Sequence, residues 1–125
     1  RDTGLITANH LIKIQGELER NNAGFRKLPG TALKSSSGDT VYTPPQDPAE
    51  IVALMSDLER CINDAGLFAV DSLIKMALIH HQFESTHPFY DGNGRTGRIL
   101  NVLYLVKEDL LDVPVLYLLI RPCEV

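Results

Sequence analysis

The chain has 125 residues, of which 44% are hydrophobic and 22% charged, and this length suits a single domain, residues 1–125, with its own core. The formal net charge of −4 argues against a nucleic-acid binder, which usually shows a basic excess, but it allows a nucleotide substrate held by a few local arginines. No signal peptide and no apolar run of ~18 residues occurs, so the sequence also argues against a membrane-bound protein.

The N-terminal part of the chain predicts a helix. Apolar residues at positions 6, 11, 14 and 18 lie near helical spacing, and Thr3 or Thr7 can cap the start of the helix. Residues 21–24, Asn-Asn-Ala-Gly, favour an end to the helix. Residues 25–33 contain Pro29-Gly30 and are typical of connecting chain.

Residues 34–45 predict a short β-hairpin. Residues 35–39, Ser-Ser-Ser-Gly-Asp, have the composition of a turn. The β-prone segment Thr40, Val41, Tyr42 and Thr43 follows, and Pro44-Pro45 ends it.

The next segment has a strong helix start. Asp47 can cap it, Pro48 suits the first helical position, and Glu50 can complete a capping box. Gly66 marks the end of this helix. Its expected buried face consists of Ile51, Leu54, Leu58, Cys61 and Ile62.

Two further helices are expected on either side of a special loop. The first covers residues 70–83, with Leu73, Ile74, Ala77 and Leu78 pointing inward. The second begins at about Gly94 and carries Ile99, Leu100, Leu103 and Val106 on its apolar face. Pro114 separates it from a last apolar segment, residues 115–120. The predicted fold class is therefore all-α, four or five helices with one small hairpin.

The loop at residues 87–98, His-Pro-Phe-Tyr-Asp-Gly-Asn-Gly-Arg-Thr-Gly-Arg, has the composition of a polyphosphate site. Gly92 and Gly94 permit backbone angles at which successive N–H groups converge on one anion, and the start of the following helix adds its positive end. Arg95 and Arg98 are three residues apart, so they share a helix face and can reach two phosphates.

An acidic and a basic side chain of this loop, Asp91 and His87, predict metal binding and base catalysis. A carboxylate beside a polyphosphate repels it unless a divalent cation lies between them, so Asp91 predicts Mg²⁺. His87, with an ordinary pKa of ~6.5, suits a general base that deprotonates a hydroxyl for attack on phosphorus. Phe89 is expected to point into the core and pin the loop.

Other residues near the loop have plainer interpretations. His80 and His81 could form a metal site with His87, but adjacent helical residues point about 100° apart, which favours structural roles. Glu84 could be a ligand or catalyst, and the favoured interpretation is that it hydrogen-bonds locally and braces the loop. Tyr90 is interpreted as a surface or loop-packing residue.

These residues match every defined position of the Fic (filamentation induced by cAMP) signature H-x-F-x-[D/E]-G-N-G-R-x-x-R. The segments on both sides also resemble the family, as does the segment 40–45, which is similar to its strand-containing flap. The resemblance covers about residues 25–118.

The resemblance implies a Fic-type helical domain and a nucleotidyltransferase that transfers AMP from Mg-ATP to a Tyr, Thr or Ser hydroxyl of a target protein. His87 would be the base and Asp91 the Mg²⁺ ligand. The flap would bind the target by strand-like backbone pairing through Thr40, Val41, Tyr42 and Thr43. The residues expected to bind the nucleotide are Gly92, Asn93 and Gly94, whose amides form the anion hole, with Arg95, Thr96, Gly97 and Arg98.

Several alternatives stay open at this point. The group transferred could be UMP, phosphocholine or phosphate, the reaction could remove AMP, or the chain could be a non-catalytic nucleotide-binding module. Family members often carry an inhibitory helix with [S/T]-x-x-x-E-[G/N], which has no match here. Such a helix would lie upstream, belong to an antitoxin partner, or not exist. The chain begins with Arg1, not Met, so we expect a trimmed fragment. Only two cysteines, at unrelated spacing, favour a bacterial cytoplasmic protein.

Overall fold

The structure is a computed structural model that describes residues 4–66 and 70–111. In these residues the chain forms four helices and a two-stranded antiparallel hairpin, in the order α1 (Ala8–Glu19), β1 (Leu33–Lys34), β2 (Thr40–Tyr42), α2 (Pro48–Asn63), α3 (Ser72–Thr86) and α4 (Asn93–Lys107). The predicted fold class is confirmed. The last apolar segment, residues 115–120, lies outside the described residues.

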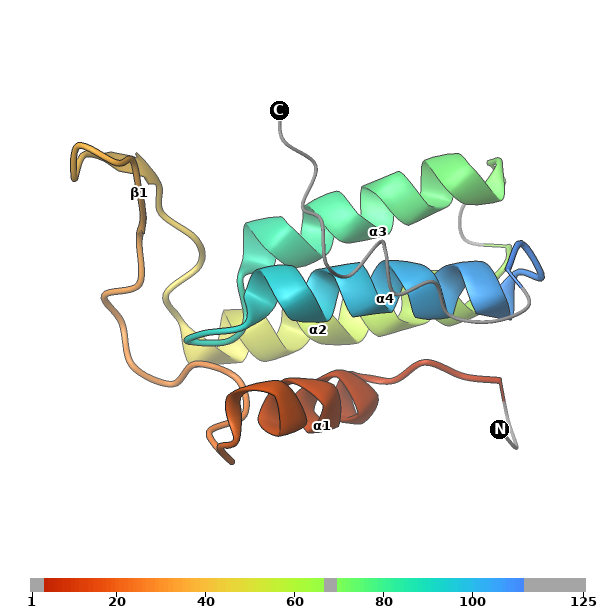
Figure 1. Ribbon diagram of the computed structural model, residues 1–125, viewed down its shortest axis with the longest axis horizontal. Helices are drawn as coiled ribbons and strands as arrows, with labels where there is room; N and C mark the ends of the chain where they lie inside the picture. The colour runs from red at the N-terminus through yellow and green to blue at the C-terminus, as the bar shows by residue number, and fades with distance from the viewer. Residues whose placement is uncertain (1–3, 67–69, 112–125) are drawn as a thin grey trace.

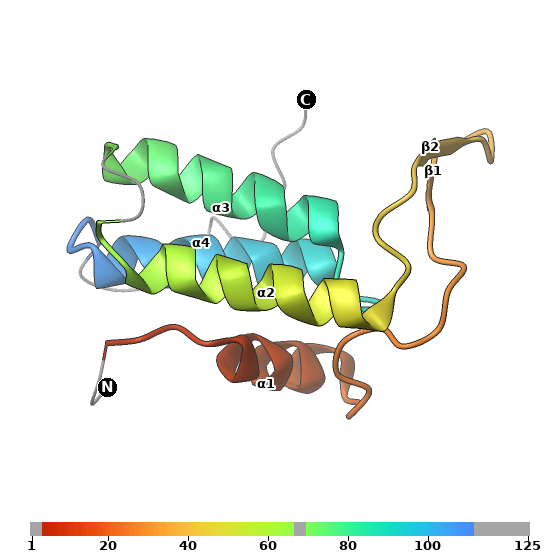
Figure 2. The ribbon, with the colours of Figure 1, turned by 180° about the vertical axis from the view of Figure 1, so that it is seen from behind.

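Helices α2, α3 and α4 form a bundle, and α1 covers one side of it. Helix α3 packs against both α2 and α4, while α1 lies along the opposite side and contacts α4 and α2 (Figures 1 and 2). The hairpin projects from the same end of the bundle as the loop between α3 and α4 (Figure 1). The core lies between the helices and consists of Ile6, Leu11, Ile51, Met55, Leu58, Ile62, Ile79, Phe83, Phe89, Leu100 and Tyr104.

The helix starts follow the capping rules. Thr7, one of the two expected caps, accepts a hydrogen bond from the backbone N–H of His10, and the His10 side chain accepts one from the N–H of Thr7. Asp47 caps α2 by accepting from the N–H of Ala49, and Pro48 takes the first helical position.

The predicted inward face of α3 is wrong. Leu73, Ile74 and Leu78 are 55%, 55% and 47% exposed, and Ala77 is exposed too. Because α3 packs with one side on both α2 and α4, its buried side is set by these two neighbours and consists of Lys75, Ile79, Phe83 and Thr86. On α4, Leu100 is buried as predicted, whereas Ile99, Leu103 and Val106 are half-buried.

The hairpin is smaller than its predicted span. Leu33 pairs with Tyr42 and Lys34 with Thr40, with an irregularity between them. Its base is held by Gln46, whose side chain accepts from the N–H of Gly30 and donates to the carbonyl of Thr31. Among the described residues, no helix is long and apolar enough to cross a membrane.

Candidate functional site

The start of α4 is an uncapped helix N-terminus. Its N-cap is Gly92, in the left-handed region with φ of 80°, and no side chain caps the helix there. The first-turn N–H groups therefore have no side-chain acceptor, and this arrangement suits an anion. A Cβ at Gly92 would lie 3.0 Å from Cγ of Glu19, so a side chain at this position would be both strained and crowded.

The side chain of Asn93 stabilises the loop by two hydrogen bonds to the backbone of Phe89. Its Oδ1 accepts from the N–H of Phe89 at 2.9 Å, and its Nδ2 donates to the carbonyl of Phe89 at 2.7 Å. Phe89 is 0% exposed, as predicted, and its ring lies 5.2 Å from that of Phe25. The side chain of Asn93 is thus used within the loop, and only its backbone N–H faces the helix start.

His87 is the C-cap of α3 and has a left-handed backbone, with φ of 47°. Its side chain is half-buried, and within residues 4–66 and 70–111 its imidazole has no hydrogen-bond partner. Burial lowers the pKa of His87, the charge of Arg26 lowers it further, and Asp91 opposes both. The lowered pKa favours the neutral ring, which is the form that can accept a proton.

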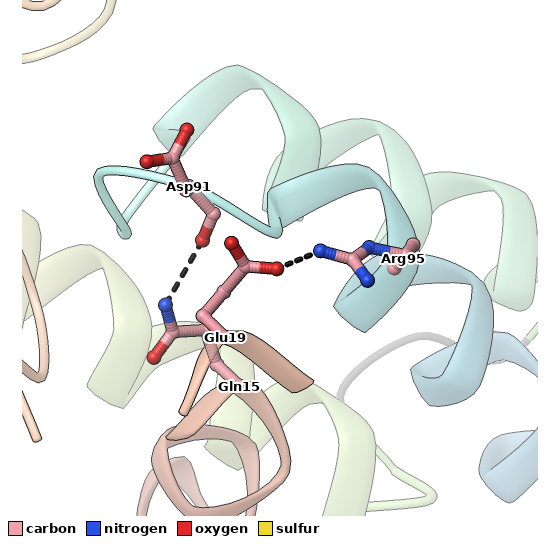
Figure 3. A network of polar contacts seen from close by, with 4 residues as sticks. All are labelled: Gln15, Glu19, Asp91 and Arg95. Atoms are coloured by element: carbon pink, nitrogen blue, oxygen red, sulfur yellow. Dashed lines mark hydrogen bonds and ion pairs between the residues drawn. The ribbon is translucent and has the colours of Figure 1, made fainter. Parts of the chain in front are cut away.

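Asp91 presents its carboxylate to solvent. Its backbone carbonyl accepts a hydrogen bond from Nε2 of Gln15 at 3.0 Å, while its carboxylate points away from Gln15 and Glu19 (Figure 3). In the described part of the chain, that carboxylate has no hydrogen bond or ion pair. An exposed, unpaired carboxylate next to an uncapped helix start fits Mg²⁺ bound by one protein carboxylate and phosphate oxygens.

Arg95 already has an anionic partner. Its guanidinium forms an ion pair with the carboxylate of Glu19, which reaches over from the end of α1 (Figure 3). The side chain of Arg95 is 50% exposed and that of Glu19 only 18%. The carboxylate of Glu19 also lies beside Gly92, so it occupies space that an anion at the helix start would need.

Arg98 follows Arg95 by three residues on α4 and lies near the half-buried carboxylate of Glu84. A Cβ at Gly94 would lie 3.5 Å from Nη1 of Arg98, so this guanidinium folds back toward the first turn of α4. Burial raises the pKa of Glu84, and the charges of His80 and Arg98 oppose this effect. Both arginines therefore border the helix start, each next to a glutamate.

Thr96 and Gly97 face the protein interior. Thr96 is 0% exposed, and a Cβ at Gly97 would lie 2.8 Å from Oε1 of Glu84 and 3.2 Å from the ring of Phe83. Gly97 thus lets α4 pack closely on α3, and Thr96 is buried with its hydroxyl unpartnered among the described residues. The prediction that Glu84 hydrogen-bonds locally and braces the loop is wrong for the described residues. Its Oε1 is buried without a hydrogen-bond partner there, because it packs from α3 against α4 at Gly97.

The four flap residues are exposed, and one of them anchors the hairpin. Val41 is 70% exposed, and Thr40 and Thr43 are exposed as well. The hydroxyl of Tyr42 donates to the carbonyl of Ser85, at the end of α3, at 2.8 Å. The hairpin is thereby tied to the helix that ends in His87.

The histidine pair forms no metal site. Nδ1 of His80 lies 3.1 Å from Nδ2 of Asn101, which links α3 to α4, and His81 is exposed. Within the described residues, no group of three or more His, Cys, Asp or Glu side chains could hold a metal ion. Tyr90 packs in a loop as predicted, since its hydroxyl accepts from the N–H groups of Lys27 and Leu28.

Three residues around the site were not predicted from the sequence. Gln15 is 2% exposed, and its place between the apolar positions 14 and 18 was an available signal of a polar group on a buried face. Glu19 ends the same helix, but no local pattern shows that it faces Arg95. Arg26 is 1% exposed and lies in connecting chain, where arginine is ordinarily a surface residue.

Comparison with known proteins agrees with this geometry. Residues 5–105 match the sequence model described as the Fic/DOC family. Protein adenylyltransferase fic-1 from Caenorhabditis briggsae is 33% identical over 111 residues, 83% of this chain and 21% of that protein. Protein adenylyltransferase Fic from Drosophila melanogaster is 38% identical over 63 residues, 50% of this chain and 13% of that protein. The chain thus spans a small part of these relatives.

Two solved structures share the fold. A Fic domain containing signaling protein from Bacteroides thetaiotaomicron superposes with a TM-score of 0.68 and 22% identity, covering 83% of this chain and 40% of that one. A fragment of Fic-1 from Caenorhabditis elegans gives a TM-score of 0.63 and 22% identity, covering 86% and 31%. The expected Fic-type arrangement of helices and hairpin is therefore confirmed.

Proposed function

The chain belongs to the Fic/DOC family, and from this premise we propose that it is a protein adenylyltransferase that transfers AMP from ATP to a hydroxyl side chain of a target protein. The proposal depends on one observation: the uncapped start of α4 follows the turn of His87 closely in the chain and carries Arg95 and Arg98 in its first two turns. Its relatives named protein adenylyltransferase support the choice of AMP.

Different residues of the chain bind the phosphates, the metal ion and the target. The N–H groups of Asn93 and Gly94 bind phosphate oxygens, with Gly92 allowing close approach, and Arg95 and Arg98 bind the outer phosphates. Asp91 holds Mg²⁺, which neutralises phosphate charge when bound. Strand Thr40–Tyr42 of the flap aligns an extended target segment beside the site.

The chemical step is an exchange of bonds at phosphorus. The target hydroxyl oxygen bonds to the α-phosphorus, the bond from that phosphorus to the bridging oxygen breaks, and pyrophosphate leaves. A ring nitrogen of His87 takes the hydroxyl proton. A positioned general base of this kind is typically worth ~10²–10⁴ in rate.

Replacing the base tests this function. With ATP labelled at the α-phosphate and Mg²⁺, we expect the protein to label itself or a protein of a cell lysate, and His87→Ala to lower the labelling rate by ~10²–10⁴. His81→Ala is the matched control, because His81 is an exposed histidine of α3 away from the loop. Full labelling by the His87→Ala protein would exclude His87 as the base.

The mass that the target gains identifies the transferred group. AMP is expected, and a mass equal to UMP, phosphocholine or phosphate would keep the transferase class and overturn the choice of donor. Unmodified target, together with release of AMP from a pre-modified one, would establish the reverse reaction. ATP binding without either reaction would show a non-catalytic module.

A further inference from the structure

Arg26 is the largest side chain that is fully buried in the described part of the chain. It lies in the connection between α1 and β1 and is 1% exposed. A buried guanidinium must have acceptors close by, since its desolvation is costly. The nature of these acceptors shows what Arg26 does.

The acceptors are consecutive carbonyl groups around His87. The backbone N–H of Arg26 donates to the carbonyl of Pro88 at 2.7 Å, and its Nε donates to that of His87 at 2.6 Å. Its Nη2 donates to the carbonyl of Thr86 at 3.2 Å. These carbonyls follow the last turn of α3, where the helix dipole favours a cation.

The same guanidinium also reaches the flap. Nη2 of Arg26 donates to the carbonyl of Pro45, which follows β2, at 2.9 Å. Tyr42 makes a second link between the hairpin and the end of α3. Arg26 therefore joins the base of the flap to the residue that carries the imidazole.

This arrangement determines the direction of the His87 side chain. A left-handed backbone is unfavourable for a residue with a Cβ, by roughly 1 kcal/mol or more, so it persists only where neighbours hold it. Arg26 bonds the carbonyls before, at and after His87. With both adjoining peptide planes held, the Cα–Cβ bond of His87 has one direction.

We propose that Arg26 is a positioning residue that holds the turn of His87 and couples it to the flap; the proposal rests on the function proposed above. Arg26 is not a ligand of ATP or of the target, because it is 1% exposed. Its Nη1, which has no partner among the described residues, is buried as well.

Two substitutions test geometry and charge separately. Arg26→Lys keeps a cation but loses the planar fork, whereas Arg26→Gln loses the cation and most of the donors. Both should lower kcat for AMP transfer, Arg26→Gln by roughly 10²-fold, which is the effect of a misplaced reacting group. The KM for ATP should stay within about twofold, because the phosphate-binding groups on α4 are unchanged. Lys27→Gln removes an adjacent exposed cation and should leave kcat unchanged.

A second measurement does not depend on activity. In NMR spectra, the ring-proton signals of His87 should change their chemical shift in Arg26→Gln. Their titration midpoint should rise, because a neighbouring cation is lost. Arg26 and Asp91 are the charged groups that act on this ring. The signals of His10, His80 and His81 should stay in place and report that the protein is folded.

The outcomes separate the two proposals. Full kcat in folded Arg26→Gln, or unmoved His87 signals, would overturn the positioning role. So would a loss of activity that merely follows the unfolded fraction in thermal melts. If Arg26→Gln does not fold, the milder Arg26→Lys decides by the same measurements. If the protein transfers no AMP, a selective change in the NMR signals of His87 would still support the positioning role of Arg26. Only the proposed adenylyltransferase function would then be overturned.

Discussion

Among the single residues of the site, most charged side chains already lie close to another polar or charged group of the protein. Glu19 neutralises Arg95, Glu84 lies near Arg98, and Arg26 lies behind His87. Asp91 differs from these, since its carboxylate has no hydrogen bond or ion pair within the described residues, although its charge acts on His87. The site can thus be tested one charge at a time.

Removing the carboxylate of Glu19 should strengthen ATP binding. Glu19 pairs with Arg95 and lies beside Gly92, so it competes with phosphate for both. We expect Glu19→Gln to lower the Kd for ATP by roughly 3- to 10-fold, since such a pair is worth up to ~1 kcal/mol and repulsion of phosphate adds to this. Calorimetry measures the change.

Glu17→Gln is the control, because it removes an exposed carboxylate from the same helix. Weaker ATP binding by Glu19→Gln would mean that Glu19 instead holds Arg95 in its productive position.

The acid limb of the activity profile should lie below the ordinary histidine pKa. Burial and Arg26 lower the pKa of His87, so the ring stays neutral, and active as a base, as the pH falls to that lowered value. We expect the midpoint of kcat/KM against pH to fall below ~6.5. The same shift costs stability at lower pH, because the unfolded chain then binds the proton more readily. A midpoint at or above 6.5 would contradict a base held neutral.

At the scale of elements, α3 shows how packing overrides pattern. Its apolar residues Leu73, Ile74 and Leu78 are exposed, while Lys75 is buried and donates through Nζ to the carbonyl of Asp64. The periodicity of the segment identified a helix. Its inward face depended on where α2 and α4 lie.

Two isoleucines of α3 provide a matched test of this face. Ile79 is 1% exposed and Ile74 is 55% exposed. Ile79→Ala should lower the free energy of unfolding by about 2–5 kcal/mol, because it leaves a cavity in the core. Ile74→Ala should change it by roughly 0.5 kcal/mol or less. Denaturant unfolding measures both, and equal losses would show that the exposed face is covered in solution.

In the molecule as a whole, the hairpin and the turn at His87 are held together by hydrogen bonds. Tyr42, Arg26 and Gln46 tie the hairpin to the end of α3 and to its own base. On the proposed function, the flap should therefore present a target at a set distance from His87, and α4 should bind the nucleotide.

Tyr42→Phe separates these two functions. It removes the hydrogen bond to the carbonyl of Ser85 and keeps the ring. We expect the KM for the target protein to rise about 2- to 10-fold, from the ~0.5–1.5 kcal/mol of one hydrogen bond. The Kd for ATP should not change. A change in ATP binding alone would show that the hairpin serves the nucleotide and not the target.

Local sequence signals were enough to predict the types of the elements and the composition of the loop. Caps, turn residues and apolar spacing are local signals, which is why Thr7, Asp47 and the hairpin around residues 34–45 could be predicted. The glycines and arginines of residues 87–98 likewise lie within one loop and one helix turn, so their proximity needs no tertiary contact.

The residues that reach the site from distant parts of the chain could be identified only from the folded structure. Glu19 meets Arg95, and Arg26 meets His87, across separations of more than sixty residues, by contacts that depend on how α1 and its connection lie against the bundle. The buried face of α3 was decided in the same way, by its two neighbours. Local spacing carries no information on such contacts, because many arrangements of the same helices satisfy the same pattern.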